Sequence, residues 1–129
     1  MINFVVVSHS KKLVDEAIKL ANIMKCDEFI TLNAGGMPFS DELGTDVSYI
    51  IEQINSLMDS EYIFVFCEMG SSLLSTQMAL EMLANEKVIL ADAPLIEGLM
   101  VATAANYKGA TKDTILHELQ QLKNFTKTI

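Results

Sequence analysis

The chain has 129 residues, of which 50% are hydrophobic and 20% charged, so it can form one core and disorder is not expected. It contains no apolar stretch of the roughly 20 residues that a membrane span needs and starts without the basic segment of a signal peptide. We therefore expect a cytoplasmic protein without membrane contact. The net charge of −8 excludes the basic face that nucleic acid requires and suits basic patches on partner proteins.

All nine basic residues are lysines. Without arginine, the chain offers no bidentate guanidinium clamp for a phosphate group. A bound phosphate would have to be held by backbone N–H groups, hydroxyl groups and helix N-termini.

The first predicted element is a strand over residues 3–7, a short run of β-branched and aromatic residues typical of a strand buried on both faces. It stops at Ser8, His9 and Ser10, and a helical pattern begins with Ser10 as its N-cap. In an open α/β sheet, ligands bind outside the carboxyl ends of the strands. His9 is therefore the first candidate for a functional residue, with a surface loop histidine as the alternative.

Further along, strands are predicted at residues 28–32, 62–67 and 87–91, and a polar loop at residues 33–43. Helices are predicted from an N-cap at Thr45, over about residues 73–83, from Pro94 to about residue 106, and after Thr111. This alternation predicts an α/β fold: a single doubly wound domain over residues 1–129, with a mainly parallel sheet of four or five strands and helices on both faces.

In this topology, the ends of three strands and the loop before the second helix face the same way. We predict that they form an anion cradle, and its expected phosphate-binding residues are Ser8, Ser10, Thr45, Gly70, Ser71 and Ser72. Two alternatives stay open. Thr45 can be a helix N-cap that binds no phosphate, and so can one of the two serines after Gly70.

A histidine at such an edge can act as a ligand, a base or a nucleophile. No second histidine, cysteine or carboxylate pair has metal-ligand spacing to His9, so no metal site is expected. As a nucleophile, His9 can accept a phosphoryl group whose charge the helix N-termini stabilise. Glu68 can fix the ring tautomer or be a solvated acid. Cys67 is faintly similar to the phosphocysteine of sugar-transport IIB proteins, but it extends a buried run and is expected to be an inert thiol.

Four sequence blocks carry a resemblance across nearly the whole chain: Val-Ser-His-Ser at residues 7–10, Gly-Thr-Asp at 44–46, Met-Gly-Ser-Ser-Leu-Leu-Ser at 69–75 and Ala-Pro-Leu-Ile-Glu-Gly at 93–98. Together they resemble the IIA domains of the mannose-type phosphotransferase system. They are more closely similar to the phosphotransferase subunits of phosphoenolpyruvate-dependent dihydroxyacetone kinases. The last two blocks favour that branch, because sugar-transport IIA domains carry a Gly-Gly-Ser-Pro turn instead.

This resemblance implies that His9 is a phosphorylated histidine that receives its phosphoryl group from the phosphocarrier HPr. It implies transfer to ADP held with metal ions on the subunit DhaL, while DhaK binds dihydroxyacetone. It also implies a homodimer that needs no cofactor of its own. Some relatives carry fused HPr-like and enzyme I-like domains, so the donor is expected to act in trans here. The family usually has aspartate at the position of Glu68, so this glutamate departs from the pattern that the resemblance implies.

Other functions stay open at this stage. They are a IIA domain serving a mannose-type sugar transporter, a non-catalytic regulatory module of the same fold, and a small flavodoxin-like nucleotide binder. The last lacks a glycine-rich phosphate fingerprint in its first loop.

Overall fold

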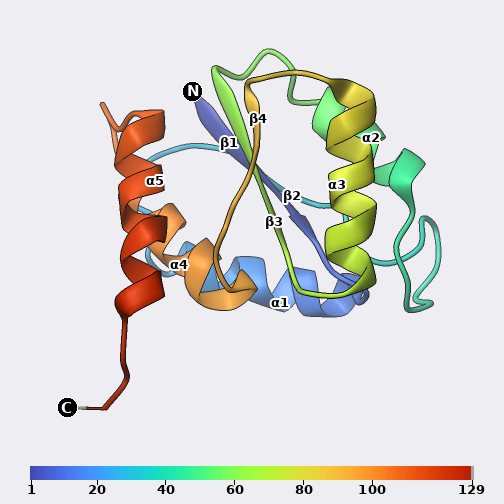
Figure 1. The fold of residues 1–129 in the computed structure, drawn as a ribbon, viewed down its shortest axis with the longest axis horizontal. Helices are drawn as coiled ribbons and strands as arrows, with labels where there is room; N and C mark the ends of the chain where they lie inside the picture. The colour runs from blue at the N-terminus through green and yellow to red at the C-terminus, as the bar shows by residue number, and fades with distance from the viewer. Residues whose placement is uncertain (129) are drawn as a thin grey trace.

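The computed structural model describes residues 1–128. Four parallel strands form one sheet in the order β2-β1-β3-β4 (Figure 1). The strands are β1 (Ile2–Val7), β2 (Thr31–Asn33), β3 (Tyr62–Cys67) and β4 (Val88–Leu90). No fifth strand is found among the described residues.

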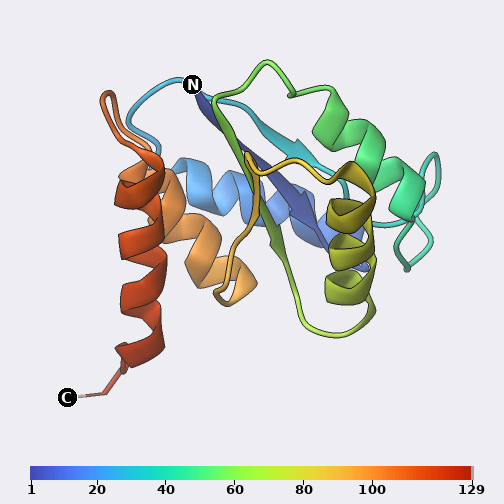
Figure 2. The ribbon, with the colours of Figure 1, turned by 45° about the horizontal axis from the view of Figure 1, so that its top comes forward.

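Helices cover both faces of the sheet, as the two ribbon views show (Figures 1 and 2). One face carries α1 (Lys11–Asn22), α4 (Leu95–Ala105) and α5 (Lys112–Gln121), which is followed by the short 3-10 turn η1 (Leu122–Asn124). The other face carries α2 (Val47–Asn55) and α3 (Ser71–Leu83). The predicted doubly wound α/β fold is therefore confirmed. Within residues 1–128, no helix is both long and apolar enough to cross a bilayer.

The two central strands are buried because their side chains alternate between two cores. Phe4 and Val6 of β1 point into the core beneath α1 and α4, whereas Val5 and Val7 point into the core beneath α2 and α3. The ring of Phe4 packs edge-on against Phe66, with centroids 5.2 Å apart. Each fully buried side chain of this size stabilises the fold by roughly 1.5 to 3 kcal/mol. The core thereby holds β1 and β3 in one register.

That register determines what lies at the carboxyl edge. Val7 at the end of β1 pairs with Cys67 at the end of β3. The next residues, Ser8 and Glu68, therefore leave the sheet side by side. The pattern predicted β3 with its observed bounds, because that strand is bounded by polar residues at both ends.

The predicted bounds of the second strand were wrong: the expected strand at residues 28–32 lies instead at Thr31–Asn33. The N–H of Ile30 donates to the side-chain oxygen of Asn3 at 2.7 Å rather than continuing a ladder. Phe29 is buried without belonging to a strand, because its ring packs against Phe4 at 5.0 Å. The strand expected at residues 87–91 is shorter by one residue at each end.

The helix starts also differ from expectation in two places. The α2 N-cap is Asp46, whose carboxylate accepts the N–H of Tyr49 at 2.8 Å, so the prediction of Thr45 as the cap was wrong. The α3 N-cap is Gly70 rather than a serine, and no side chain caps this helix. The prediction for α1 is confirmed, because the Ser10 hydroxyl accepts the N–H of Leu13 at 3.1 Å.

Candidate functional site

His9 and Glu68 follow the two central strands at the carboxyl edge of the sheet. From β1 the chain continues to β2 on one side, while β3 and β4 extend the sheet on the other. The strand order therefore reverses between β1 and β3, and open α/β sheets bind their ligands in the crevice outside such a point. His9 and Glu68 meet in that crevice.

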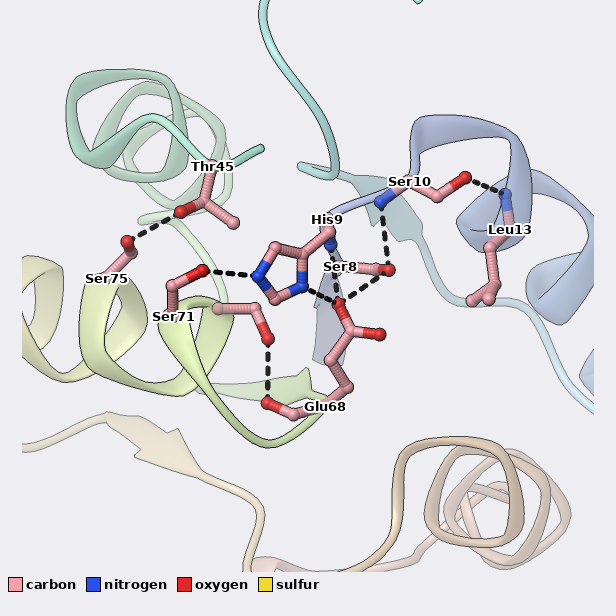
Figure 3. A network of polar contacts seen from close by, with 9 residues as sticks. Ser8, His9, Ser10, Leu13, Thr45, Glu68, Ser71 and Ser75 are labelled. Carbon is pink, nitrogen blue, oxygen red and sulfur yellow. Dashed lines mark hydrogen bonds and ion pairs between the residues drawn. The ribbon is translucent and has the colours of Figure 1, made fainter. Parts of the chain in front are cut away.

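One carboxylate oxygen of Glu68 makes three polar contacts with Ser8 and His9 (Figure 3). Oε1 lies 2.6 Å from Nδ1 of the His9 ring, 2.6 Å from the backbone nitrogen of His9 and 2.9 Å from the hydroxyl oxygen of Ser8. The ring is thus held in place by a residue 59 positions away in the sequence. The imidazole nevertheless remains 38% exposed, so another molecule can reach it.

The electrostatics of Glu68 decide where the proton on the His9 ring lies. Partial burial raises the pKa of Glu68, but the hydrogen bonds from the His9 backbone, the His9 ring and Ser8 outweigh burial, so that its pKa is lowered. An ionised carboxylate can only accept hydrogen bonds. The proton between the two groups therefore belongs to Nδ1, and Nε2 carries the free lone pair.

That lone pair faces the beginning of α3. Nε2 of His9 is in hydrogen-bond contact with the hydroxyl oxygen of Ser71, the first residue of the helix (Figure 3). Gly70 precedes it with φ +89°, a backbone conformation that side chains with a β-carbon rarely adopt. Because no side chain caps α3, its first backbone N–H groups remain available to an anion at the positive end of the helix.

The other predicted site residues surround this pair with hydroxyl groups already engaged. Ser8 and Ser72 are fully buried, and the Ser72 hydroxyl donates to the backbone carbonyl of Glu68 at 2.7 Å. Ser10 caps α1, and the hydroxyl of Thr45 lies 2.7 Å from that of Ser75. The phosphate-binding role of these residues stays a prediction. Among their hydroxyl groups, that of Ser71 is the one in contact with the His9 ring.

Sequence reasoning missed Ser75 as part of this network. Ser71 and Ser75 lie four residues apart, and residues at that spacing occupy the same face of a helix. The signal was therefore present in the sequence. The pairing of Ser75 with Thr45 was not predictable, because the contact joins α3 to a loop 30 residues away.

Cys67 is set apart from this chemistry. Its side chain is buried at the end of β3, and burial raises the pKa of its thiol. A raised pKa leaves little thiolate, the form that reacts. The expectation of an unreactive core thiol thus agrees with its position. Among the described residues, no three histidine, cysteine or carboxylate side chains lie close enough together to hold a metal ion.

A cavity of about 720 Å³ opens beside Glu68, between the ends of β3 and β4 and the start of α4. Its walls are mostly apolar and include Leu73, Leu90, Pro94 and Leu95. An apolar wall does not stabilise a phosphate group. The anion site is therefore better assigned to the α3 terminus than to this cavity.

A solvent-accessible imidazole with one nitrogen protonated and fixed, and the other facing a helix N-terminus, is suited to nucleophilic group transfer. Comparison with known proteins agrees with a role of this chain in group transfer. A family model described as the PTS system fructose IIA component (EIIA-man) matches residues 3–116. The chain belongs to this family of phosphotransferase IIA domains.

Curated relatives with similar sequences belong to one branch of this family, the phosphoryl donor subunits of dihydroxyacetone kinases. The chain is 42% identical to the phosphoryl donor subunit DhaM of the PEP-dependent dihydroxyacetone kinase from Providencia stuartii (strain MRSN 2154), over 94% of this chain and 26% of that protein. It is 36% identical to the DhaM subunit of dihydroxyacetone kinase 2 from Listeria innocua serovar 6a, over 92% of this chain and 97% of that protein. The chain thus spans about a quarter of the first relative and nearly all of the second. The expected resemblance to DhaM is confirmed.

Two solved structures support the fold. A protein of unknown function, EF1359, shares 28% identity and a TM-score of 0.84 over 93% of both chains. The mannose/sorbose specific IIA subunit from Enterococcus faecalis has a TM-score of 0.60 at 11% identity, over 98% of this chain and 93% of that one. The second likeness concerns the fold alone.

Proposed function

We propose that this chain is a phosphohistidine carrier, the phosphoryl donor subunit of a dihydroxyacetone kinase system that uses phosphoenolpyruvate. The observation that carries the proposal is the orientation of His9, with Nδ1 held by Glu68 and Nε2 facing the uncapped start of α3. Nε2 is the nitrogen that accepts the phosphoryl group. The names of the DhaM relatives support this choice of system.

In the loading step, the lone pair of Nε2 forms a bond to phosphorus while the bond from phosphorus to the donor nitrogen breaks. The His9 ring then carries a positive charge and keeps its proton on Nδ1, where the Glu68 carboxylate balances it. The transferred oxygens face the N–H groups of α3 once the Ser71 hydroxyl has turned from the ring to the phosphoryl group. Unloading reverses these changes, and the protonated ring is the better leaving group. Positioning and charge stabilisation are the main requirements of such transfers.

The proposed donor is phospho-HPr, and the proposed acceptor is ADP bound on DhaL, with DhaK holding dihydroxyacetone. Cationic help in the transition state has to come from these partners or from metal ions on DhaL, because this chain contains no arginine. The carrier itself would need no cofactor and would work as a homodimer in the cytoplasm.

Mapping of the phosphorylated residue tests the proposal. The protein is incubated with phosphoenolpyruvate, enzyme I and HPr, and acid-labile phosphate is located by mass spectrometry. We expect label on His9, none in His9→Ala and unchanged label in His117→Ala, since His117 is the other histidine and lies exposed on α5. Label that persists in His9→Ala would contradict the proposal.

The role of Glu68 as a positioning residue has its own test. Glu68→Gln keeps the shape of the side chain but loses the charge that balances the ring, so we expect phosphorylation of His9 to slow by roughly tenfold to a hundredfold. Glu68→Asp restores the charge and should recover most of the rate. Equal rates in the glutamine variant and the parent protein would exclude this role.

A coupled assay separates the kinase system from a sugar transporter and from a regulatory module. Purified DhaK and DhaL are added with dihydroxyacetone, phosphoenolpyruvate, enzyme I and HPr. Formation of dihydroxyacetone phosphate that requires this chain is the expected result. Labelled His9 without product would place the chain with one of the other two functions, and light scattering of the same preparation tests the homodimer.

A further inference from the structure

The segment of residues 36–44, called here the 36–44 loop, is attached to the reactive turn at both of its ends. The N–H of Gly36 donates to the carbonyl of Ser8 at 2.9 Å, and the N–H of Gly44 donates to the carbonyl of His9 at 2.9 Å. Figures 1 and 2 show this segment, in teal, projecting from the body beside α2. The loop is therefore positioned by the same backbone that positions His9.

A lysine holds the loop in shape. The Nζ of Lys11 donates to the carbonyl of Met37 at 3.0 Å and to the carbonyl of Ser40 at 3.2 Å. These two carbonyls flank Phe39. Within the loop, the N–H of Glu42 also donates to the Ser40 hydroxyl at 3.2 Å. The tip is thus tied on both sides rather than left to fluctuate.

Phe39 lies at that tip in an unfavourable backbone conformation, with its side chain exposed. Its φ is +61°, in the left-handed region that bulky residues avoid. Its side chain is fully exposed (102%), and Leu43 on the same loop is 75% exposed. A strained backbone that presents a phenyl ring to water gains no packing within the described chain. Such strain is usual where a residue contacts another molecule.

Geometry places the base of the 36–44 loop beside any protein that exchanges a group with His9. Phe39 lies three positions after Gly36, so their Cα atoms lie at most about 11 Å apart. A protein interface of ordinary size covers about 800 Å² on each partner, equivalent to a disc of about 16 Å radius. Since the reacting atoms must approach to about 3 to 3.5 Å, a partner centred on Nε2 covers Ser8 and His9, to which both ends of this loop are bonded.

Charge indicates which partner suits the loop. Asp41 and Glu42 follow the tip and are exposed; Lys12 lies 3.8 Å from Asp41, while the ammonium group of Lys11 is engaged by the carbonyls of Met37 and Ser40. Exposed carboxylates favour a basic surface and disfavour one that displays the phosphates of a nucleotide. The phosphoryl donor therefore fits this loop better than the ADP-bearing acceptor.

We propose that Phe39 is the docking anchor for the protein that donates the phosphoryl group to His9, and that the donor receives the ring in an apolar pocket bordered by basic side chains. This inference rests on the proposed function. Aromatic side chains that enter such pockets often dominate the binding energy of an interface. Phe39 would accordingly set the affinity for the donor without taking part in the chemistry.

The test measures loading of His9 as a function of phospho-HPr concentration in Phe39→Ala, Phe39→Gly and Phe39→Tyr. We expect KM to rise about tenfold or more in the alanine and glycine variants, with kcat little changed and the tyrosine variant close to the parent. Glycine adopts a left-handed backbone freely, so the Tm of Phe39→Gly should not fall. Ile23→Ala is the matched control, because Ile23 is 78% exposed at the far end of α1.

Calorimetric titration with unphosphorylated HPr separates failure of the anchor from failure of the proposed function. Weaker HPr binding in the alanine and glycine variants supports the anchor even if His9 takes no label. Unchanged KM and unchanged HPr affinity in both variants would overturn the anchor while leaving a labelled His9 intact. An effect confined to transfer to ADP, or to self-association, would overturn it as well.

Discussion

At the scale of single residues, the site depends on one oxygen atom. Oε1 of Glu68 accepts from the backbone and ring of His9 and from Ser8, so one carboxylate fixes the position, rotation and tautomer of the imidazole. The Glu68 side chain reaches the ring at 2.6 Å. A neutral side chain at this position would keep the contacts but lose the charge.

The lowered pKa of Glu68 makes part of the stability depend on pH. Because its pKa in the folded chain lies below the unfolded value of about 4.5, its stabilising effect is complete above that value and is lost as the pH falls through the folded pKa. We expect the difference in free energy of unfolding between the parent and Glu68→Gln to shrink between about pH 7 and about pH 3. Urea unfolding at both pH values measures it, and a constant difference would contradict the prediction.

Gly70 is a second residue on which the site depends. A β-carbon there would lie 3.9 Å from the His9 ring, an ordinary contact, so Gly70→Ala acts through its positive φ alone. We expect a loss of about 1 to 3 kcal/mol in the free energy of unfolding and slower phosphorylation of His9. Gly109→Ala is the control, since Gly109 has φ +90° and borders a cavity with Met1 at the opposite edge of the sheet. It should lose comparable stability and keep the phosphorylation rate.

At the scale of elements, the helices differ in how they begin. A side chain caps α1, α2 and α5, whereas α3 and α4 begin without a side-chain cap. Of the two uncapped helices, α3 is the one whose first residue contacts Nε2 of His9. Its first N–H groups need a hydrogen-bond partner, and a bound phosphoryl group can supply one.

The cap of α2 is open to a direct test. Asp46→Ala should cost about 1 kcal/mol in the free energy of unfolding and expose the amide of Tyr49 to hydrogen exchange. Thr45→Val removes the contact to Ser75 but leaves the cap, so Tyr49 should stay protected. Protection lost in the valine variant and retained in the alanine variant would restore Thr45 as the cap.

At the scale of the whole molecule, charge should govern the encounter with partners. The net charge of −8 attracts basic surfaces at long range, and salt screens that attraction. We expect kcat/KM for loading by phospho-HPr to fall as ionic strength rises, whereas hydrolysis of phospho-His9 in isolated protein should hardly change. Time courses quenched at a series of salt concentrations measure the loading rate and the hydrolysis rate. A donor reaction insensitive to salt would argue against electrostatic steering.

The sequence by itself determined the class of fold and the candidate residue. Runs such as residues 62–67, bounded by polar residues, reveal buried strands through local pattern, and topology then places their ends on one edge. The candidate His9 and the helix capped by Ser10 followed from such local signals, and the family followed from the resemblance of four sequence blocks. The bounds of the second strand did not, because Asn3 and Phe4 act there from distant parts of the chain. The cap of α2 was misplaced by one residue, because Thr45 and Asp46 are adjacent and both residue types are common N-caps.

Only the tertiary structure decided the chemistry at His9. The contact with Glu68 spans 59 positions and depends on the register of β1 against β3, which the packing of both cores determines. From it follow the protonated Nδ1, the free Nε2 and its position at α3. The 36–44 loop, with Phe39 at its tip, likewise depends on backbone hydrogen bonds to Ser8 and His9 that no local sequence pattern predicts. The sequence left Glu68 open as a ring partner or a solvated acid, and the whole fold decides between the two because the contact is not local.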